Sequence, residues 1–181
     1  MVAQIAKRVL GIKTVIGLTS HSSKFPLCKS VGCDIVLNYT SPTFEHDLSR
    51  ATPKQVDIYW DNVAGSILNI VTRRMNPGGR IICCGAMAGY GSDGAGEHFT
   101  EIRQVVIKGL KMLGLNVFLH AGDFARGLEE FEGWTRAEEE GGKGLQLVSE
   151  VMQTGFEGIP MGLERLMKGD HTGKLVTKVL H

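Results

Sequence analysis

Apolar residues recur along the chain with two different periods, which predict helices and strands in turn. Apolar positions three to four residues apart indicate helices, because they line one face of a 3.6-residue repeat. Short apolar runs rich in β-branched residues indicate buried strands. The predicted helices cover residues 2–10, 22–31, 42–52, 65–75, 100–110, 121–137 and 158–168. The predicted strands cover residues 14–18, 34–38, 56–61, 80–84, 112–118 and 173–180.

Residues that favour helix ends and turns set the boundaries of these elements. Gly11 is expected to end the first helix, since glycine adopts the left-handed conformation of a C-terminal cap. Ser22 or Ser23 can cap the second helix, and Ser41 can cap the third. The Asn-Pro-Gly-Gly sequence at residues 76–79 predicts a turn before the fourth strand.

The alternation of strands and helices predicts an α/β fold with a doubly wound, Rossmann-type parallel sheet. In such a sheet the first strand is central, and the Gly-rich turn after it binds the pyrophosphate of a dinucleotide. The sequence opens directly on a helix. We therefore expect a sheet that lacks its first strand and Gly-rich phosphate loop. The neighbouring strands would then expose unpaired backbone groups, which predicts self-association of the chain.

Residues 89–94 match the dinucleotide fingerprint literally, with glycines at its three required positions. That fingerprint must join a strand tightly to a helix, so that the helix N-terminus meets the phosphates. Here several residues separate the motif from the fourth strand, and the next helix starts only near residue 100. The acidic residue expected about 20 positions later is also missing. We interpret the motif as a loop at the carboxyl end of a strand, where it can still touch a ligand.

The charge balance argues against several classes of function. Twenty basic and nineteen acidic residues give a net charge of +1, which does not indicate a nucleic-acid or membrane surface. Apolar runs stay shorter than the roughly 18 residues of a membrane-spanning helix, and the N-terminus has no signal-peptide pattern. We expect a cytoplasmic protein of 181 residues with a sizeable apolar core.

Four cysteines, Cys28, Cys33, Cys83 and Cys84, provide the only thiols of the chain. Their spacing contains no C-x-x-C pair, and no histidine cluster completes a zinc site. We expect reduced, mostly buried thiols and no bound metal.

Five short motifs stand beside the predicted strands, in a fixed order along the chain. They are Lys24, Asn38-Tyr39, Asp61-Asn62-Val63-Ala64-Gly65, Cys84-Gly85-Ala86-Met87-Ala88-Gly89-Tyr90, and Gly169-Asp170-His171-Thr172-Gly173-Lys174. This ordered set resembles the zinc-independent medium-chain dehydrogenase/reductases, in particular the prostaglandin reductase and alkenal double-bond reductase branch. The resemblance covers nearly the whole chain.

The resemblance implies an enzyme that uses NADPH to reduce the carbon–carbon double bond of an enone or alkenal. It implies that residues 1–168 form an incomplete dinucleotide-binding domain. Residues 169–181 would then be a C-terminal return strand toward a catalytic domain that this sequence does not contain. Two alternatives stay open: a quinone reductase of the same superfamily, and a truncated, non-catalytic interaction module. The expected partners are a small enone, aldehyde or quinone substrate and further copies of the chain, with no nucleic acid and no membrane.

Lys24 is the residue for which local chemistry and the resemblance agree. A strand end that carries a cation and no carboxylate suits a phosphate better than a free ribose diol. The resemblance assigns Lys24 to the 2′-phosphate of NADPH. The alternative is a solvated surface lysine.

The resemblance implies further cofactor contacts after the other strands. They are Tyr39 on the phosphate side, Asn62, the loop residues Cys84, Gly85, Ala86, Met87, Ala88, Gly89 and Tyr90, then Leu115, Asn116 and Val117 near the nicotinamide, and His171. Tyr39 could instead be a half-buried strand-end residue, Asn62 a turn residue, and residues 115–117 an ordinary core strand. His171 stands where the family usually has an asparagine, so its role is open. No residue is identified as the catalytic acid.

Overall fold

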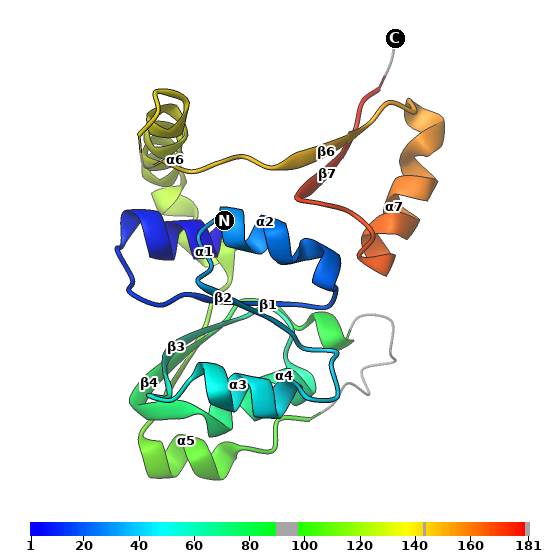
Figure 1. The fold of residues 1–181 in the computed structure, drawn as a ribbon. Helices are drawn as coiled ribbons and strands as arrows, with labels where there is room; N and C mark the ends of the chain where they lie inside the picture. The colour runs from blue at the N-terminus through cyan, green and yellow to red at the C-terminus, as the bar shows by residue number, and fades with distance from the viewer. Residues whose placement is uncertain (90–97, 143, 180–181) are drawn as a thin grey trace. The chain divides into compact units, whose positions relative to one another are not determined.

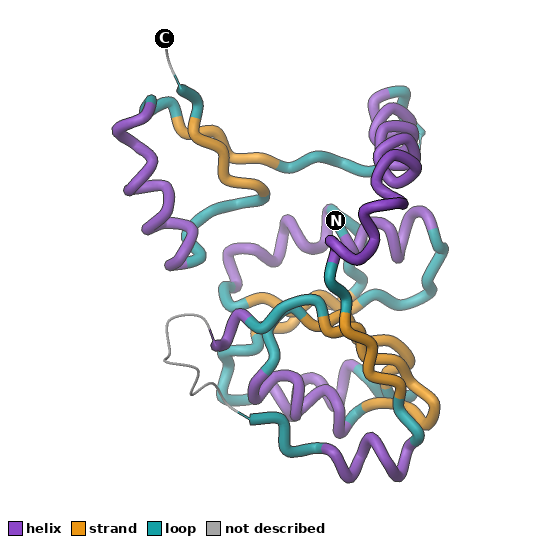
Figure 2. The backbone as a smooth tube through the Cα atoms, turned by 180° about the vertical axis from the view of Figure 1, so that it is seen from behind, coloured by secondary structure: helices purple, strands orange, loops and turns teal. Residues whose placement is uncertain are grey.

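A computed structural model describes residues 1–89, 98–142 and 144–179 of the chain (Figure 1). Strands and helices alternate along these residues, which confirms the predicted α/β class (Figure 2). The strands lie in three sheets, in the orders β1-β2, β3-β4-β5 and β6-β7, instead of one continuous sheet. The chain divides into two compact units. The first unit contains residues 1–17, 22–36 and 126–181, and the second contains residues 18–21 and 37–125.

Strands β1 (Ile16–Thr19) and β2 (Ile35–Asn38) pair with each other and contribute residues to both units. The N–H of Asp34 donates to the carbonyl of Val15 in the first unit, and that of Tyr39 donates to the carbonyl of Thr19 in the second. From the first bond to the second, both the donor and the acceptor lie further toward the C-terminus, which is the order that parallel pairing requires.

The second unit carries most of the regular structure. Its elements are α3 (Phe44–Ala51), β3 (Val56–Asp61), α4 (Gly65–Arg73), β4 (Met75–Cys83), η3 (Met87–Gly89), α5 (Ile102–Lys108), β5 (Lys111–Gly114) and η4 (Val117–Asp123). Its buried apolar cluster consists of Phe44, Leu48, Ile67, Leu68, Val71, Met75, Ile81 and Leu110. The members on α3 and α4 recur at helical spacing, so each helix turns one apolar stripe inward. Burying each such side chain stabilises the fold by roughly 1.5–3 kcal/mol.

The parallel pairing of β3 with β4 contains one irregularity. Val56 pairs with Met75 and Ile58 pairs with Arg80, so a single residue of β3 faces residues 76–79 of β4. The prediction of a separate turn at residues 76–79 was therefore wrong, because these residues form a bulge inside β4. Beyond the bulge the register is regular, and Asp61 pairs with Cys83.

The first unit combines short helices with a two-stranded parallel sheet. Its elements are α1 (Val2–Gln4), the π-helical η1 (Ile5–Val9), η2 (Ser22–Lys24), α2 (Phe25–Ser30), most of α6 (Phe124–Glu139), β6 (Ser149–Met152), η5 (Phe156–Gly158), α7 (Ile159–Lys168) and β7 (Lys174–Thr177). Polar side chains connect these segments. The side-chain amide of Gln4, which is 2% exposed, makes two hydrogen bonds with the backbone of Gln146. Arg8 forms an ion pair with Glu138 at 3.0 Å.

Two predicted caps and one predicted strand boundary need correction, and one strand was not predicted. Neither α2 nor α3 has a side-chain cap: Ser22 begins a 3₁₀ turn, and the Ser41 hydroxyl accepts from the Thr43 N–H in a turn before α3. The strand predicted for residues 112–118 ends at Gly114, because the Asn116 side chain accepts from the Phe118 N–H and begins η4. Strand β6 was missed, since it is short and half of it is polar.

Candidate cofactor-binding site

The carboxyl ends of three neighbouring strands meet in the second unit. Asp61 at the end of β3 pairs with Cys83 at the end of β4, and Cys83 pairs with Gly114 at the end of β5. Because the strands are parallel, the segments that follow them emerge from the same edge of the sheet. In open α/β sheets this edge is where ligands bind.

Asp61 organises the turn after β3. This residue is 1% exposed, and its Oδ1 accepts from the Tyr59 hydroxyl and from the backbone N–H groups of Val63 and Ala64, each at 3.0 Å. These bonds hold Ala64 at φ 63°, a conformation that favours glycine. Burial, together with the charge of Asp61, raises the pKa of Tyr59, so this phenol stays neutral and donates.

Sequence reasoning did not single out Asp61 as a site residue. The sequence feature that could have identified Asp61 is an aspartate at the end of an apolar strand, followed by residues whose N–H groups its carboxylate can accept from. Such Asx turns are a common use of aspartate.

The loop after β4 is joined to the turn after β3 by backbone hydrogen bonds. The N–H groups of residues 84, 85, 87 and 88 donate to the carbonyl oxygens of residues 61–63, with N···O distances from 2.8 to 3.2 Å. Asn62 therefore lies directly beside the predicted loop residues. The side chains of Asn62, Cys84 and Met87 are exposed.

Gly85 permits the close approach of these two segments. A Cβ atom at this position would lie 2.8 Å from the carbonyl oxygen of Asn62, closer than a Cβ tolerates. A larger residue would push the loop away from the turn.

Residues 115–117 lie next to the same loop. The N–H of Leu115 donates to the carbonyl of Cys83 at 2.9 Å. Asn116 caps η4, and Val117 is 56% exposed. The alternative of a core strand does not hold here, because β5 has already ended. The structure thus brings together Asn62, residues 84–89 and residues 115–117. Tyr90, like the rest of the glycine motif up to residue 94, lies outside the described residues.

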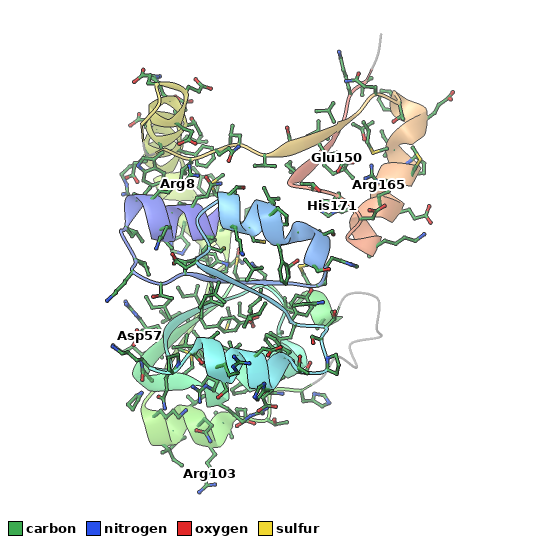
Figure 3. The ribbon with its side chains drawn as sticks, in the orientation of Figure 1. Arg8, Asp57, Arg103, Glu150, Arg165 and His171 are labelled. Carbon is green, nitrogen blue, oxygen red and sulfur yellow. The ribbon has the colours of Figure 1, made fainter. Side chains whose placement is uncertain are left out.

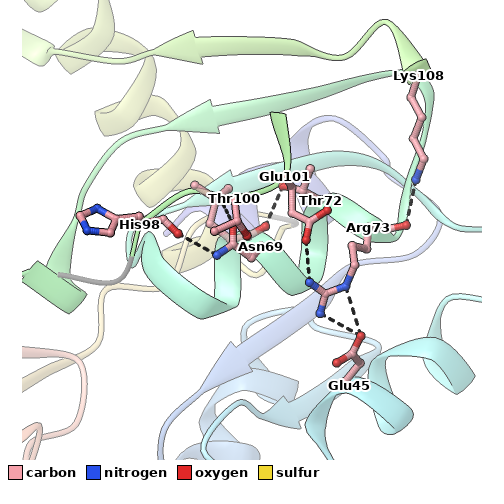
Figure 4. A network of polar contacts seen from close by, with 9 residues as sticks. Glu45, Asn69, Thr72, Arg73, His98, Thr100, Glu101 and Lys108 are labelled. Atoms are coloured by element: carbon pink, nitrogen blue, oxygen red, sulfur yellow. Dashed lines mark hydrogen bonds and ion pairs between the residues drawn. The ribbon is translucent and has the colours of Figure 1, made fainter. Parts of the chain in front are cut away.

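Residues 98–101, which precede α5, are fixed to α4 (Figure 4). The Asn69 side chain donates to the carbonyl of His98 and accepts from the N–H of Thr100, each at 2.9 Å. One turn later, Arg73 forms ion pairs of 2.9 Å with Glu101 and with Glu45 of α3. A single face of α4 thereby ties the start of α5 to α3.

Tyr39 follows β2 at another strand end of the second unit. Its N–H bonds to Thr19 at the end of β1 at 3.0 Å, and its ring packs against the buried cluster. The Thr40 hydroxyl donates to the carbonyl of Ser20 at 3.2 Å, which connects the two turns. Tyr39 is half-buried, which also agrees with the alternative that it is an ordinary residue at the end of a strand.

Lys24 and His171 belong to the first unit, whereas the other described candidates belong to the second. Lys24 is half-buried at the end of η2, the 3₁₀ turn that follows β1. Figure 3 shows His171 beside Glu150 and Arg165, which form an ion pair of 2.6 Å. Across the described chain, the Nδ1 atom of His171 is a buried side-chain nitrogen without a hydrogen-bond partner. Nothing in the sequence indicates that this nitrogen is buried without a partner.

Residues 1–89, 98–142 and 144–179 contain no group of three His, Cys, Asp or Glu side chains placed to hold a metal ion. A zinc site needs at least three such protein ligands, so this part of the chain does not fit zinc. Within the same described residues, no helix is both long and apolar enough to cross a membrane.

Comparison with known proteins reveals relatives along the whole chain. The sequence pattern of the family described as zinc-binding dehydrogenase matches residues 1–133. Prostaglandin reductase 1 of Oryctolagus cuniculus is 31% identical over 176 residues, which make up 96% of this chain and 48% of that protein. The NADPH-dependent curcumin reductase of Escherichia coli K12 is 26% identical over 98% of this chain and 51% of its own length.

Solved structures with the same fold include CurA of Vibrio vulnificus in complex with NADPH. It superimposes with a TM-score of 0.84 at 24% identity, over 98% of this chain and 53% of CurA. At that identity the likeness concerns the fold alone. The chain spans about half the length of the relatives it matches.

Proposed function

Since this chain belongs to the zinc-binding dehydrogenase family, we propose that it forms the cofactor-binding part of an NADPH-dependent oxidoreductase. One observation carries the proposal: β3, β4 and β5 end in register, with an exposed loop of small residues bonded across their carboxyl edge. The relatives named as prostaglandin reductase and NADPH-dependent curcumin reductase support the same class of reaction.

In this proposal each candidate residue has a defined task. The Lys24 ammonium binds the 2′-phosphate, because a cation without a carboxylate beside it in sequence favours NADPH over NADH. Residues 84–90 let the dinucleotide approach their backbone, since glycine and alanine leave room. Asn62 and residues 115–117 contact the cofactor beside that loop, and Tyr39 contacts its phosphate side. The cofactor supplies hydride, while the protein supplies position and electrostatics.

His171 is proposed to hydrogen-bond the nicotinamide end of the cofactor. The observation behind this assignment is its buried Nδ1 atom, which lacks a partner in the described chain. Either ring nitrogen of a neutral imidazole can donate or accept, so His171 can take over a contact that an asparagine would make.

The substrate class is a finer proposal. We propose the α,β-unsaturated carbonyl group of an enone or alkenal, with a quinone as the alternative. Residues 1–168 would bind the cofactor, and residues 169–181 would lead toward a catalytic domain. The relatives are about twice as long as this chain and so have room for such a domain. NADPH oxidation in the presence of an enone, compared with a quinone, separates these substrates. A non-catalytic interaction module would oxidise NADPH with neither. Homo-oligomerisation and a cytoplasmic location remain predictions.

The decisive experiment is a titration of the chain with NADPH and with NADH. Lys24→Ala should weaken NADPH binding by about tenfold or more, the equivalent of one charge-assisted contact of roughly 1.5–3 kcal/mol. NADH binding should stay unchanged, because NADH has no 2′-phosphate.

Lys29→Ala is the matched control, since Lys29 is an exposed lysine in the last turn of the adjoining helix α2. It should alter neither titration. If the unsubstituted chain binds both cofactors equally and Lys24→Ala changes nothing, the assignment of the 2′-phosphate to Lys24 is wrong.

A further inference from the structure

Helix α2 ends in a motif that brings two cysteines together. The N–H of Cys33 donates to the carbonyl of Cys28, and the N–H of Gly32 donates to the carbonyl of Lys29, each at 3.0 Å. Gly32 adopts φ 103° between them. This pair of bonds is the Schellman motif, in which the side chains at the two ends of the outer bond pack against each other. Here both of those side chains carry thiols.

Both cysteine side chains also face the same point of β1. A Cβ atom on Gly17 would lie 3.4 Å from the Cβ of Cys33 and 3.8 Å from the Cβ of Cys28. It would also lie 2.8 Å from the Cys33 Sγ. The absence of a side chain at Gly17 therefore leaves space over the strand, and the Cβ atoms of both cysteines border this space. All three residues belong to the first unit.

We propose that Cys28 and Cys33 are a redox modification site that closes to an intrachain disulfide when a small disulfide such as oxidised glutathione is present. Each side chain starts from backbone that the Schellman motif already holds together. Disulfides require Cβ atoms about 3.5–4.5 Å apart, a separation compatible with two side chains packed over one glycine. Neither cysteine is among the proposed cofactor contacts.

The reaction is a pair of thiol–disulfide exchanges. The Cys28 thiol loses its proton to solvent, and its sulfur attacks the small disulfide, so that a mixed disulfide forms and one small thiol leaves. The Cys33 sulfur, after losing its own proton, then attacks the Cys28 sulfur and expels the second small thiol. The protein gives up two electrons and two protons, and the small disulfide is reduced to two thiols.

The order of the two steps follows from exposure. Cys28 is partly exposed, whereas Cys33 is 7% exposed. Burial raises the pKa of the Cys28 thiol, and the charge of Lys24 partly offsets that shift. Burial raises the pKa of Cys33 to about 11, and the proximity of Cys28 adds to this increase. Cys28 is therefore the attacking thiol and Cys33 the resolving one.

The test is a peptide map of the full chain after incubation with excess oxidised glutathione and blocking of the remaining thiols. Trypsin cleaves after Lys24, Lys29 and Arg50, so it separates the two cysteines. The expected product is peptide 25–29 disulfide-linked to peptide 30–50, in a protein lighter by two hydrogen atoms. NADPH is not needed, so failure of the proposed function would leave this result unaffected.

Two variants sharpen the test. The double variant Cys83→Ser and Cys84→Ser should give the same linked peptides. Cys33→Ser should stop at a glutathione adduct on Cys28, with an unchanged circular dichroism spectrum. If Cys33→Ser does not fold, the map of the unsubstituted chain still decides. A stable glutathione adduct on Cys28 of the unsubstituted chain, a link to Cys83 or Cys84, or two unmodified thiols at residues 28 and 33 would each overturn the proposal.

Discussion

In the second unit, apolar side chains of α3, α4 and β4 close around Met75 and Ile81, both of which are 0% exposed. The first unit depends more on polar contacts, such as those from Gln4 to Gln146 and from Arg165 to Glu150. Both units leave large apolar side chains exposed, such as Leu163 of α7 at 59% and Val106 of α5 at 75%.

The two units should therefore differ in how they lose structure. Buried apolar contacts carry no charge that salt can screen, whereas exposed ion pairs are individually weak and screened. The chain has one tryptophan in each unit, Trp60 in the second and Trp134 in the first. Replacing either by Phe leaves a fluorescent reporter on the other unit. We expect the Trp134 signal to change at lower urea concentration than the Trp60 signal.

The largest expected effect is that of Asp61→Ala. It leaves the Tyr59 hydroxyl and the N–H groups of Val63 and Ala64 without their acceptor in a buried site. We expect the free energy of unfolding of the second unit to fall by about 3 kcal/mol or more, measured in urea with the Trp60 reporter.

Asp57→Ala is the matched control on the same strand. Asp57 is exposed at the start of β3 and accepts from the Asn76 side chain at 2.7 Å. Its loss should cost about 1 kcal/mol or less. Equal effects of the two substitutions would show that Asp61 does not organise the strand end.

Gly85→Ala should have the next largest effect. The added methyl group meets the Asn62 carbonyl, so the loop after β4 must shift. We expect a loss of about 1–3 kcal/mol, as for other overpacked sites, together with weaker NADPH binding. Gly114→Ala is the control, because no heavy atom lies within 4 Å of its Cβ position. Unchanged stability and NADPH affinity in Gly85→Ala would mean that the loop does not need this close approach.

Arg73→Met tests the polar side of the second unit. It removes the ion pairs with Glu45 and Glu101 but keeps an unbranched apolar stem on α4. We expect a loss of about 1 kcal/mol that shrinks at high salt, because Glu45 and Arg73 are partly exposed. Urea unfolding at low and at high salt, followed through Trp60, measures it. A salt-independent loss would point to packing as the cause instead.

The smallest effect concerns pH and the first unit. The Thr172 N–H and the Arg165 guanidinium hold the pKa of Glu150 below its ordinary value of 4.5. A lowered pKa in the fold contributes stability at pH values above the ordinary pKa, and this contribution disappears as the pH falls through the lowered pKa. The amide resonance of Thr172 should therefore titrate below pH 4.5. Glu150→Gln should abolish that titration and leave the Trp60 signal unchanged. If the Trp60 signal changed at the same pH as the Thr172 resonance, the two units would not differ in their response to pH.

Much of the fold could be predicted because periodicity is a local property. The strand predicted for residues 56–61 matches β3 in full, since its apolar run is bounded by clear turn residues. The boundaries failed where a side chain competed with the regular backbone pattern. Asn116 ended β5 early by capping η4, and Ser41 formed a turn before α3. Neither choice is visible in the spacing of apolar residues.

The candidate site could be predicted only in part, for a different reason. The positions after strands β3, β4 and β5 follow from chain order, because parallel strands end at one edge. The buried partners of Asp61 and the unpartnered Nδ1 of His171 depend on contacts between distant segments. The cysteine pair was missed as well, since spacing rules search for C-x-x-C and not for the two ends of a helix cap.

The bulge within β4 has a consequence for variation of chain length. Residues 76–79 face a single residue of β3, yet the register is regular again before Asp61 pairs with Cys83. An added or deleted residue here would change the strand before its carboxyl end and would leave the pairing of Asp61 with Cys83 in place. This point of the chain is therefore a suitable place for a short epitope tag or a labelling sequence, and a stretch in which orthologous sequences can differ in length without moving the carboxyl edge of the sheet.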